Sequence, residues 1–338
     1  MQSETQRSPG RLIKIPARGV RSLVWRGDEL VDIVGGGIRY ALDGSSTGGF
    51  VNYAFTFDRA TTSPSGDFSV IYTDLGTKAL VLRRDGSIVR EVDRSFYFAD
   101  RYEYPMALAT VDGRDLLVHC PRSYCRIEIE EVESGKVLTE RDSKPSKDFF
   151  HSRLAVSPDG RYLLSAGWFW RPYSGLLGYD INEALRRPEH LDEPGLVGWD
   201  DFESEVGSTA FLGSDCVVVA AAVDDPRDED EPETGPLPRE LCLWSIAENR
   251  WLSRVNVDGP IGTIMAIDRT SCLSLYEHPK LIDLATGEVT ASWPEIESGT
   301  QVDSFVTDRM DVPPTALDPA HRRFAIASAE TITVVDLT

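Results

Sequence analysis

Histidine and cysteine are scarce in this chain, and their spacing excludes the common metal and catalytic signatures. The sequence has 338 residues with only five histidines and five cysteines. The histidines form neither an H-E-x-x-H motif nor a paired Cys–His cluster, so no local zinc motif is present. The sequence spacing of these residues does not exclude a metal site that is assembled from distant segments. The histidines are His119, His151, His190, His278 and His321.

The cysteines do not form a disulfide framework. They are odd in number, scattered, and mostly placed within apolar runs. This pattern is typical of reduced, buried thiols in a cytoplasmic protein. Cys120 and Cys125 flank a predicted hairpin loop, so a local bridge or half of a metal site is the alternative for that pair. The others are Cys216, Cys242 and Cys272.

Long apolar runs and excess positive charge are also missing. No run approaches the roughly 18 residues of a membrane span, and the polar segment Met1–Gly10 has no apolar core of a secretory signal. The net charge is -20 and the pI is about 4.7. Such a chain repels phosphate backbones and anionic lipids, so we expect neither nucleic acid nor membranes as partners. Hydrophobic residues make up 41% of the chain, enough for a sizeable core.

One local group of positive residues lies near the N-terminus. We interpret it as the polar side of an outer strand rather than as a phosphate site. It consists of Arg11, Lys14, Arg18, Arg21 and Arg26.

A turn sequence recurs along the chain. Ser157–Arg161 reads Ser-Pro-Asp-Gly-Arg, and Ser63–Asp67 reads Ser-Pro-Ser-Gly-Asp. Weaker relatives occur at Val111–Arg114 and Asp318–Arg322, and each copy is followed by a β-rich run. Repetition at a period of a few tens of residues indicates stacked supersecondary units.

The β-type runs group into units of four strands. We count seven units, and the spacing also allows six or eight. The first unit is predicted as Ser22–Trp25, Glu29–Val34, Ile38–Leu42 and Phe50–Phe55. The third is predicted as Met106–Val111, Leu116–Cys120, Arg126–Glu131 and Val137–Glu140, and the fourth begins with Ser152–Val156.

The last unit has only three strands of its own. We expect the lone run Arg11–Pro16 to pair beside Thr331–Asp336, which would close the units into a ring without exposed sheet edges. The prediction is therefore an all-β protein, a seven-bladed β-propeller closed by an N-terminal strand that completes the last blade. Residues 1–338 form one domain in this interpretation, with a flexible tail at 1–10 and an acidic loop insertion at 224–239.

The turns and strand ends resemble those of WD-repeat and related bacterial β-propellers. Ser157–Gly167 is similar to the turn between the first two strands of a blade, and Leu281–Val289 and Val334–Leu337 are similar to the end of the third strand. The Gly-His dipeptide of WD repeats is absent. The Trp-Asp pair is replaced by Ile282-Asp283, Val335-Asp336 and other pairs, so the buried Ser/His/Asp/Trp network of regular blades is not expected.

Two short glycine-containing motifs have structural explanations. Gly44–Gly48 matches the G-x-S-x-G pattern of a nucleophile elbow, but no helix follows it, so we interpret it as a hairpin loop. Gly35–Gly37 lacks the Lys-Ser/Thr and the helix of a phosphate loop and is explained by a hairpin that needs positive φ angles. The innermost strands carry small residues, mostly hydroxyl-bearing, and no set of carboxylates or imidazoles.

Asp180–Glu183 resembles a capping box and predicts that a short helix begins there. Pro188 is expected to end this helix.

Two unusual loops are the candidate binding elements. Gly167–Tyr173 falls between the second and third strands of the fourth unit, and its aromatic residues and arginine have the composition of an interface hot spot. The alternative is that these aromatics fold back as a satellite core. The acidic loops should lie on the same face as this loop. Connections between the second and third strands of a blade, and connections from one blade to the next, leave a propeller on one side. The candidate partner-binding residues are Trp168, Phe169, Trp170, Arg171, Tyr173, Trp199, Asp200, Asp201, Asp228, Glu229, Asp230 and Glu231.

These features favour a non-enzymatic scaffold or adaptor that binds another protein through one propeller face, and the acidic loops suit a partner with a basic surface. The alternative is a lactonase-like hydrolase or small-molecule binder at the channel mouth. A regulatory domain of a bacterial multi-protein system is a narrower form of the first hypothesis. We predict no catalytic residue, cofactor or bound metal. The prolines within the acidic run make it a poor calcium loop, and the oligomeric state stays open.

Overall fold

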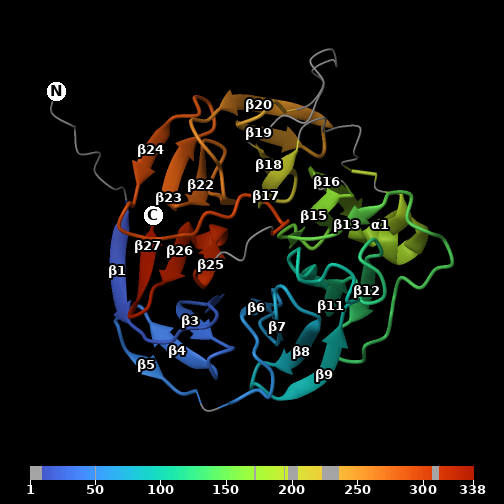
Figure 1. The fold of residues 1–338 in the computed structure, drawn as a ribbon, viewed down its shortest axis with the longest axis horizontal. Helices are drawn as coiled ribbons and strands as arrows, with labels where there is room; N and C mark the ends of the chain where they lie inside the picture. The colour runs from blue at the N-terminus through green and yellow to red at the C-terminus, as the bar shows by residue number, and fades with distance from the viewer. Residues whose placement is uncertain are drawn as a thin grey trace.

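The strands form seven small antiparallel sheets arranged in a ring, a seven-bladed β-propeller (Figure 1). The computed structural model describes residues 10–49, 51–170, 173–193, 195–196, 205–222, 236–306 and 312–338. Each blade places its first strand nearest the centre of the ring and its last strand at the outside. The predicted fold class and blade number are confirmed.

The first three blades follow one another along the chain. Blade 1 contains β2 (Val24–Arg26), β3 (Glu29–Asp32), β4 (Ile38–Ala41) and β5 (Ser46–Thr47). Blade 2 contains β6 (Arg59–Thr62), β7 (Phe68–Tyr72), β8 (Lys78–Arg83) and β9 (Ile88–Asp93). Blade 3 contains β10 (Met106–Val111), β11 (Arg114–His119) and β12 (Glu128–Glu131).

The remaining blades complete the ring. Blade 4 contains β13 (Phe149–Phe150), β14 (Leu154–Val156), β15 (Tyr162–Phe169) and β16 (Tyr173–Asp180). Blade 5 contains β17 (Val206–Leu212), β18 (Cys216–Ala221), β19 (Glu240–Ser245) and β20 (Arg250–Asn256). Blade 6 contains β21 (Thr263–Ala266), β22 (Ser271–Tyr276), β23 (His278–Asp283) and β24 (Val289–Ser292). Blade 7 contains β25 (Thr315–Asp318), β26 (Arg323–Ala327), β27 (Thr331–Asp336) and β1 (Arg11–Pro16).

The N-terminal strand closes the ring as predicted. β1 pairs antiparallel with β27 from Arg11 opposite Asp336 to Pro16 opposite Thr331. Ile15 is fully buried and packs with Ile332 and Val334 in one core cluster. The two ends of the chain are therefore joined in one sheet, and closure leaves blade 7 with its full set of four strands.

The recurring turn has the same geometry in its two best copies. The amide of Ser157 donates to the carbonyl of Tyr162, and the amide of Ser63 donates in the same way to Phe68. In both copies the serine hydroxyl accepts the amide that closes the turn. Gly160 has a φ of +75°, and a Cβ there would lie 2.6 Å from the Thr110 carbonyl oxygen of the neighbouring blade. The glycine is thus required both by its backbone conformation and by the close approach of blade 3.

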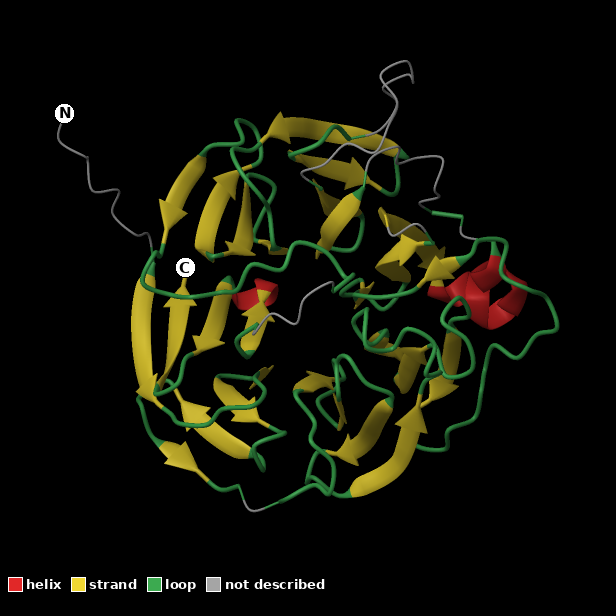
Figure 2. Cartoon of the chain, in the orientation of Figure 1, coloured by secondary structure: helices red, strands yellow, loops and turns green. Residues whose placement is uncertain are grey.

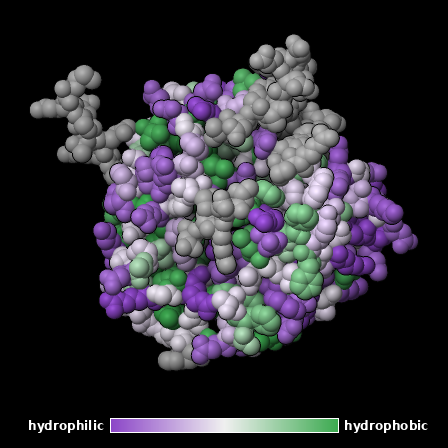
Figure 3. Space-filling view, in the orientation of Figure 1, coloured by the Kyte–Doolittle hydropathy of each residue, from purple (hydrophilic) through white to green (hydrophobic). Residues whose placement is uncertain are grey.

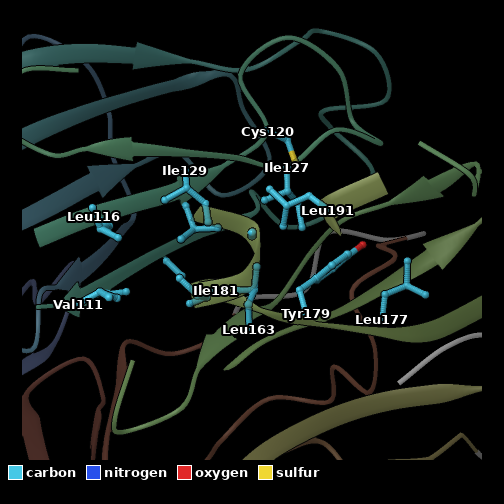
Figure 4. Packing of buried hydrophobic residues seen from close by; sticks show 14 of the residues in the cluster. Val111, Leu116, Cys120, Ile127, Ile129, Leu163, Leu177, Tyr179, Ile181 and Leu191 are labelled. Carbon is cyan, nitrogen blue, oxygen red and sulfur yellow. The ribbon is translucent and has the colours of Figure 1, made fainter. Parts of the chain in front are cut away.

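The core lies between neighbouring blades rather than at the centre of the ring. Figure 4 shows one such interface, where side chains from blades 3 and 4 interdigitate, among them Leu116, Ile129, Leu163 and Tyr179. Both faces of the central strands are buried, so β11, β15 and β18 appear in the sequence as nearly continuous apolar runs. Each blade therefore depends on its neighbours for burial of its apolar faces.

Three predicted strands differ from the structure. Phe50–Phe55 was predicted as the outer strand of blade 1, but residues 51–55 form no strand, and β5 is formed by Ser46–Thr47 within the Gly44–Gly48 hairpin. Positive φ angles at Gly48 and Gly49 turn the chain away from the sheet directly after β5. Val137–Glu140 forms only an isolated bridge between Val137 and Glu130.

The predicted inner strand of blade 4 is interrupted. β13 and β14 both pair with β15, and the chain bulges between them at Arg153, which has a φ of +41°.

Helix is rare in this structure (Figure 2). α1 (Ile181–Arg186) begins as predicted, because the Asp180 side chain accepts from the Glu183 amide. Pro188 then begins a 3-10 turn, η1 (Pro188–Asp192), which the buried Arg141–Asp192 ion pair of 2.7 Å ties to the chain after blade 3. A second 3-10 turn, η3 (Pro319–His321), lies in the β25–β26 connection. Over the described ranges, no helix has the length and apolar character that crossing a membrane requires.

The connection between blades 6 and 7 crosses the ring. Figure 1 draws this segment over the centre, from β24 toward β13 and β15. Along the way, the Glu277 amide donates to the Gly299 carbonyl, and the Glu103 amide donates to the Ser304 carbonyl. Phe305 forms a bridge with Tyr102. We call residues 294–306 the crossing segment, and it joins blade 6 to the opposite side of the propeller.

Candidate interaction surface

The candidate surface rests on a buried pair of stacked rings in blade 4. Phe150 of β13 lies opposite Trp168 of β15 in the sheet register. Their ring centroids are 3.8 Å apart with an interplanar angle of 11°. Tyr102 packs edge-on against Phe150, and Phe305 of the crossing segment packs edge-on against Trp168. All except Phe305 are almost fully buried, so this base is rigid.

A second layer of rings continues the stack outward to solvent. Tyr124 stacks on Phe150 at 3.9 Å, and Tyr97 stacks on Tyr124 at 5.2 Å. Trp170 meets Tyr97 at 6.4 Å and Phe98 edge-on at 5.2 Å. The outermost rings are Phe96, Tyr97, Phe98 and Trp170, which are 85%, 46%, 38% and 49% exposed. We call these four residues the aromatic patch.

The loop that carries three of these rings is held by one buried arginine. Arg94 follows β9, and its guanidinium donates to the carbonyls of Asp74, Gly76, Ala99 and Tyr102. It also lies over the ring of Tyr102 at 4.4 Å. Burial lowers the pKa of Arg94, but a guanidinium stays charged at any physiological pH. The cation therefore joins two carbonyls of this loop, those of Ala99 and Tyr102, to two carbonyls of the β7–β8 turn.

Phe98 holds an unusual conformation within that loop. Its φ is +54°, a region that a bulky side chain rarely occupies. The amide of Ala99 donates to Phe96, and that of Arg101 donates to Phe98, so a tight double turn presents the aromatic side chains outward. Strain kept by surrounding contacts is more frequent at binding sites than elsewhere. The conformation therefore supports a role for this loop beyond packing.

The patch and the crossing segment leave the propeller on the same face. Trp170 lies at the β15–β16 turn, a second-to-third-strand connection, whereas Phe96–Phe98 and the crossing segment connect one blade to the next. Figure 3 shows hydrophilic and hydrophobic side chains interspersed over the part of the molecule drawn in colour in this view. The sequence prediction that these two kinds of connection share one face agrees with the strand topology.

Charged groups from blade 2, from the connections of blades 2 to 4 and from the crossing segment gather in one cluster. Arg153 forms a 2.9 Å ion pair with Glu103 and donates to the carbonyls of Gly207 and Asp303. Gln301 donates to the same Glu103 carboxylate at 2.6 Å. Arg153 thus fixes the crossing segment to blades 3, 4 and 5 at once. The group also includes Arg59, Asp74 and Asp303, and we call it the inner charged cluster.

Asp74 is the titratable centre of this cluster. Burial raises its pKa to about 7, and the nearby Glu103 charge adds to the shift. Arg59 lies 3.4 Å from the carboxylate and opposes the shift without cancelling it. Burial also raises the pKa of Asp303. The cluster therefore changes charge near neutral pH.

This titration predicts a stability change with pH. The pKa of Asp74 is higher in the folded state than in the unfolded state. Its contribution to the free energy of unfolding is therefore complete below about pH 4 and is lost as the pH rises through about 7. Relative to the unmodified protein, Asp74→Asn should therefore gain stability as the pH rises from about 4 to about 7, by at most about 4 kcal/mol at 1.36 kcal/mol per pKa unit. Denaturant unfolding at several pH values measures the difference. The exposed control Asp67→Asn should show no such trend, and a flat difference for Asp74→Asn would contradict the assignment.

No family model and no curated protein matches this chain. Among solved structures, a chain in the crystal structure of the mitotic checkpoint complex superposes with a TM-score of 0.59 at 12% identity, covering 99% of this chain and 94% of that one. The computationally designed Ika8 protein superposes with a TM-score of 0.53 at 14% identity, covering 97% and 99%. Identities this low show likeness of fold alone.

The structure buries some of the predicted aromatic residues and exposes others. Trp168 and Phe169 lie inside β15 and are 2% and 9% exposed, which matches the satellite-core alternative. Trp170 is half exposed and belongs to the patch. Arg171, the side chain of Tyr173, and the candidates Trp199, Asp200, Asp201, Asp228, Glu229, Asp230 and Glu231 lie outside the described residues. Sequence reasoning missed Phe96–Phe98, although three adjacent aromatics outside any predicted strand were a signal for them.

The described residues give no support to a local metal or catalytic centre. In the described ranges, no group of three or more histidines, cysteines or acids is arranged so that it could hold a metal ion. Cys120 and Cys125 are both free thiols. Ser46, which holds the nucleophile position of the elbow-like motif, lies exposed in the two-residue strand β5 and is not followed by a helix. The inner charged cluster does contain carboxylates that the sequence prediction missed, and two of them form ion pairs, Asp74 with Arg59 and Glu103 with Arg153.

Proposed function

We propose that this chain is a non-enzymatic scaffold that binds a segment of another protein through the aromatic patch. The single observation that carries the proposal is a set of exposed aromatic side chains that pack against a buried aromatic base. Tyr97, Phe98 and Trp170 each contact the ring of Phe150, and Phe96 is exposed beside them in the sequence. Aromatic rings held at the surface by a rigid support have the properties of interface hot spots, because they bury a large area with little loss of side-chain freedom. A ring system needed only for packing would not extend outward to Tyr97 and Trp170.

Charge complementarity indicates the chemistry of the partner. The chain carries 55 acidic and 35 basic residues, so its field attracts positively charged segments. Exposed tyrosine and tryptophan faces bind guanidinium and ammonium groups directly. We therefore propose a partner segment that combines arginine or lysine with an apolar residue.

The acidic residues of the long connections extend the proposal. Asp200 and Asp201 belong to the connection between β16 and β17, and Asp228–Glu231 belong to that between β18 and β19. The β18–β19 connection starts from the same face as the patch, because Ala221 lies opposite Val206 at that end of blade 5. The β16–β17 connection starts on the opposite face, where Asp180 lies opposite Tyr162, and it returns to the patch face at the start of β17. We propose that these carboxylates, with Trp199, surround the bound segment, in a cytoplasmic adaptor of the WD-repeat-like kind.

The crossing segment argues against the alternative of a hydrolase at this mouth of the channel. It lies over the centre of the ring, and Arg153, Gln301 and Glu103 hold it there. A cleft of about 1110 Å³ lies beside the crossing segment and blade 7. Its acids, which include Glu277, Glu295 and Glu297, are not grouped as metal ligands over the described residues.

Peptide selection tests the proposal even though the natural partner is unidentified. A displayed library of random peptides is selected on the native protein after depletion on the Tyr97→Ala, Trp170→Ala double variant. We expect the recovered peptides to be enriched in arginine or lysine next to an apolar residue. Failure to enrich any sequence, or enrichment of acidic sequences, would contradict the proposal.

A further inference from the structure

A second unusual feature lies far from the patch, at the junction of blades 1 and 2. A pocket of about 300 Å³ opens between the β3–β4 turn, the chain after β5 and the β8–β9 turn. Four arginines line it: Arg26, Arg39, Arg83 and Arg84. The volume is at the small end of the range for ligand pockets. The proposed function does not use this pocket.

The charge of this pocket is opposite to that of the whole protein. The chain has a net charge of -20, yet the pocket lining contains four cations and a single acid, Asp85. The Asp85 carboxylate accepts from the amide and hydroxyl of Ser87 and so is already engaged in its own turn. Arg83 forms a 2.7 Å ion pair with Glu133 of blade 3, whereas Arg39 meets Glu29 only at 3.8 Å. The lining therefore concentrates positive charge that its own carboxylates do not balance.

Arg26 forms the floor of the pocket. Its Nη2 donates to the Ser69 hydroxyl at 2.9 Å, and its Nη1 donates to the Arg84 carbonyl at 3.3 Å. Its Nε is buried and has no hydrogen-bond partner in the structure. A buried donor without a partner costs free energy, and the guanidinium to which it belongs lines the pocket.

The positive charges also act on one another. Burial lowers the pKa of Arg26 most, and the charges of Arg39 and Arg84 lower it further. Arginine does not escape this repulsion by losing its proton. An anion between the guanidinium groups would turn the repulsion into attraction, and a phosphate offers oxygens that match the guanidinium donors.

We infer that this pocket binds a phosphate group, either as a free ion or as part of a small organic phosphate. The convergence of four arginines, the orphaned Nε of Arg26 and the size of the pocket all fit this ligand. The ring of Tyr53 also lines the pocket and would meet a base or sugar attached to the phosphate. The ligand is held by charge-assisted hydrogen bonds, so binding should weaken as salt screens the charges. Binding of an organic phosphate should also weaken below about pH 6, where a phosphate monoester loses its second negative charge.

Calorimetric titration with inorganic phosphate, pyrophosphate and AMP tests the inference on the full chain. We expect the native protein to bind at least one of them. The Arg39→Gln, Arg84→Gln double variant should bind about tenfold or more weakly, as expected for the loss of hydrogen bonds between charged groups. Both side chains are exposed, so the variant should fold normally. Tighter binding of AMP than of the inorganic ions would identify an organic phosphate, and the reverse would identify the free ion.

The matched control removes the same charge elsewhere. Arg114 is the exposed first residue of β11, and Arg269 is exposed in the turn between β21 and β22. Arg114→Gln with Arg269→Gln also lowers the net charge by two. This control should retain native affinity. The inference is overturned if the native protein binds none of the three probes, or if the pocket variant and the control lose affinity equally. Because the patch is intact in both variants, their peptide binding should be unchanged, which separates this inference from the proposed function.

Discussion

Deleting residues 1–17 should remove most of the stability of the propeller. The deletion removes all of β1, which pairs with β27 over six residues. It also removes the fully buried Ile15 and the partly buried Ile13, and a buried isoleucine contributes about 1.5–3 kcal/mol. Since whole domains are stable by only about 5–15 kcal/mol, we expect either an insoluble product or a loss of several kcal/mol in denaturant unfolding.

Point variants separate the packing of β1 from the general effect of truncation. Ile15→Ala should cost about 2–5 kcal/mol, as for other large-to-small changes in a core. Leu12→Ala in the same strand should cost far less, because Leu12 is 39% exposed. A synthetic peptide of residues 10–18 added to the truncated chain should restore part of the lost stability. A truncated chain as stable as the native protein would show that closure by β1 does not stabilise the ring.

Replacing Tyr97 and Trp170 by alanine should abolish tight binding of the basic peptides that the native protein selects. Hot-spot aromatics cost about 2 kcal/mol or more each on truncation, so the double variant should bind at least about 100-fold more weakly. Fluorescence anisotropy of a labelled peptide measures this change. The fold should be retained, because both side chains are about half exposed and the buried pair Phe150 and Trp168 beneath them is left in place.

The control for this experiment removes exposed apolar surface elsewhere. Phe55 and Ile88 are 58% and 55% exposed and do not belong to the patch. Phe55→Ala with Ile88→Ala should leave peptide affinity unchanged. If both double variants lose affinity to the same extent, binding is a nonspecific hydrophobic effect and the patch has no special role.

Regular repeats made the architecture predictable from the sequence. The turns at Ser63 and Ser157 need a glycine at the same place and a serine to close the loop, and both have that geometry in the structure. The alternating run Arg11–Pro16 has one fully buried residue, Ile15, and an unpaired partner strand at the other end of the chain. These local patterns depend on backbone geometry, which is why one sequence was sufficient to identify them.

Strand prediction failed where residues typical of β-strands pack against the core instead of pairing in a sheet. The aromatic-rich stretch before Phe57 has the composition of a strand. In the structure, Gly48 and Gly49 lead the chain out of the sheet, and Tyr53 and Phe57 pack against residues of blades 1 and 2. Composition alone does not distinguish these two uses of aromatic side chains.

The candidate surface was only partly predictable. Trp168 and Phe169 have the composition of a binding loop, but β15 is long enough to include both, and its two faces are buried by neighbouring blades. Phe96–Phe98 come next to Trp170 only because the ring brings blades 3 and 4 together. The inner charged cluster was missed for a similar reason, because Asp74 and Glu103 lie in connections rather than in the inner strands that line the axis.

Hydrogen exchange of the native protein with and without a selected basic peptide tests the central claim most directly. We predict slower exchange of the backbone amides of residues 95–101 and of the residues next to Trp170 when the peptide is bound. The β8–β9 turn at residues 83–86, which belongs to the arginine pocket, should exchange at an unchanged rate. Protection confined to that turn or to another blade, with residues 95–101 unaffected, would contradict the account of the aromatic patch as the binding surface.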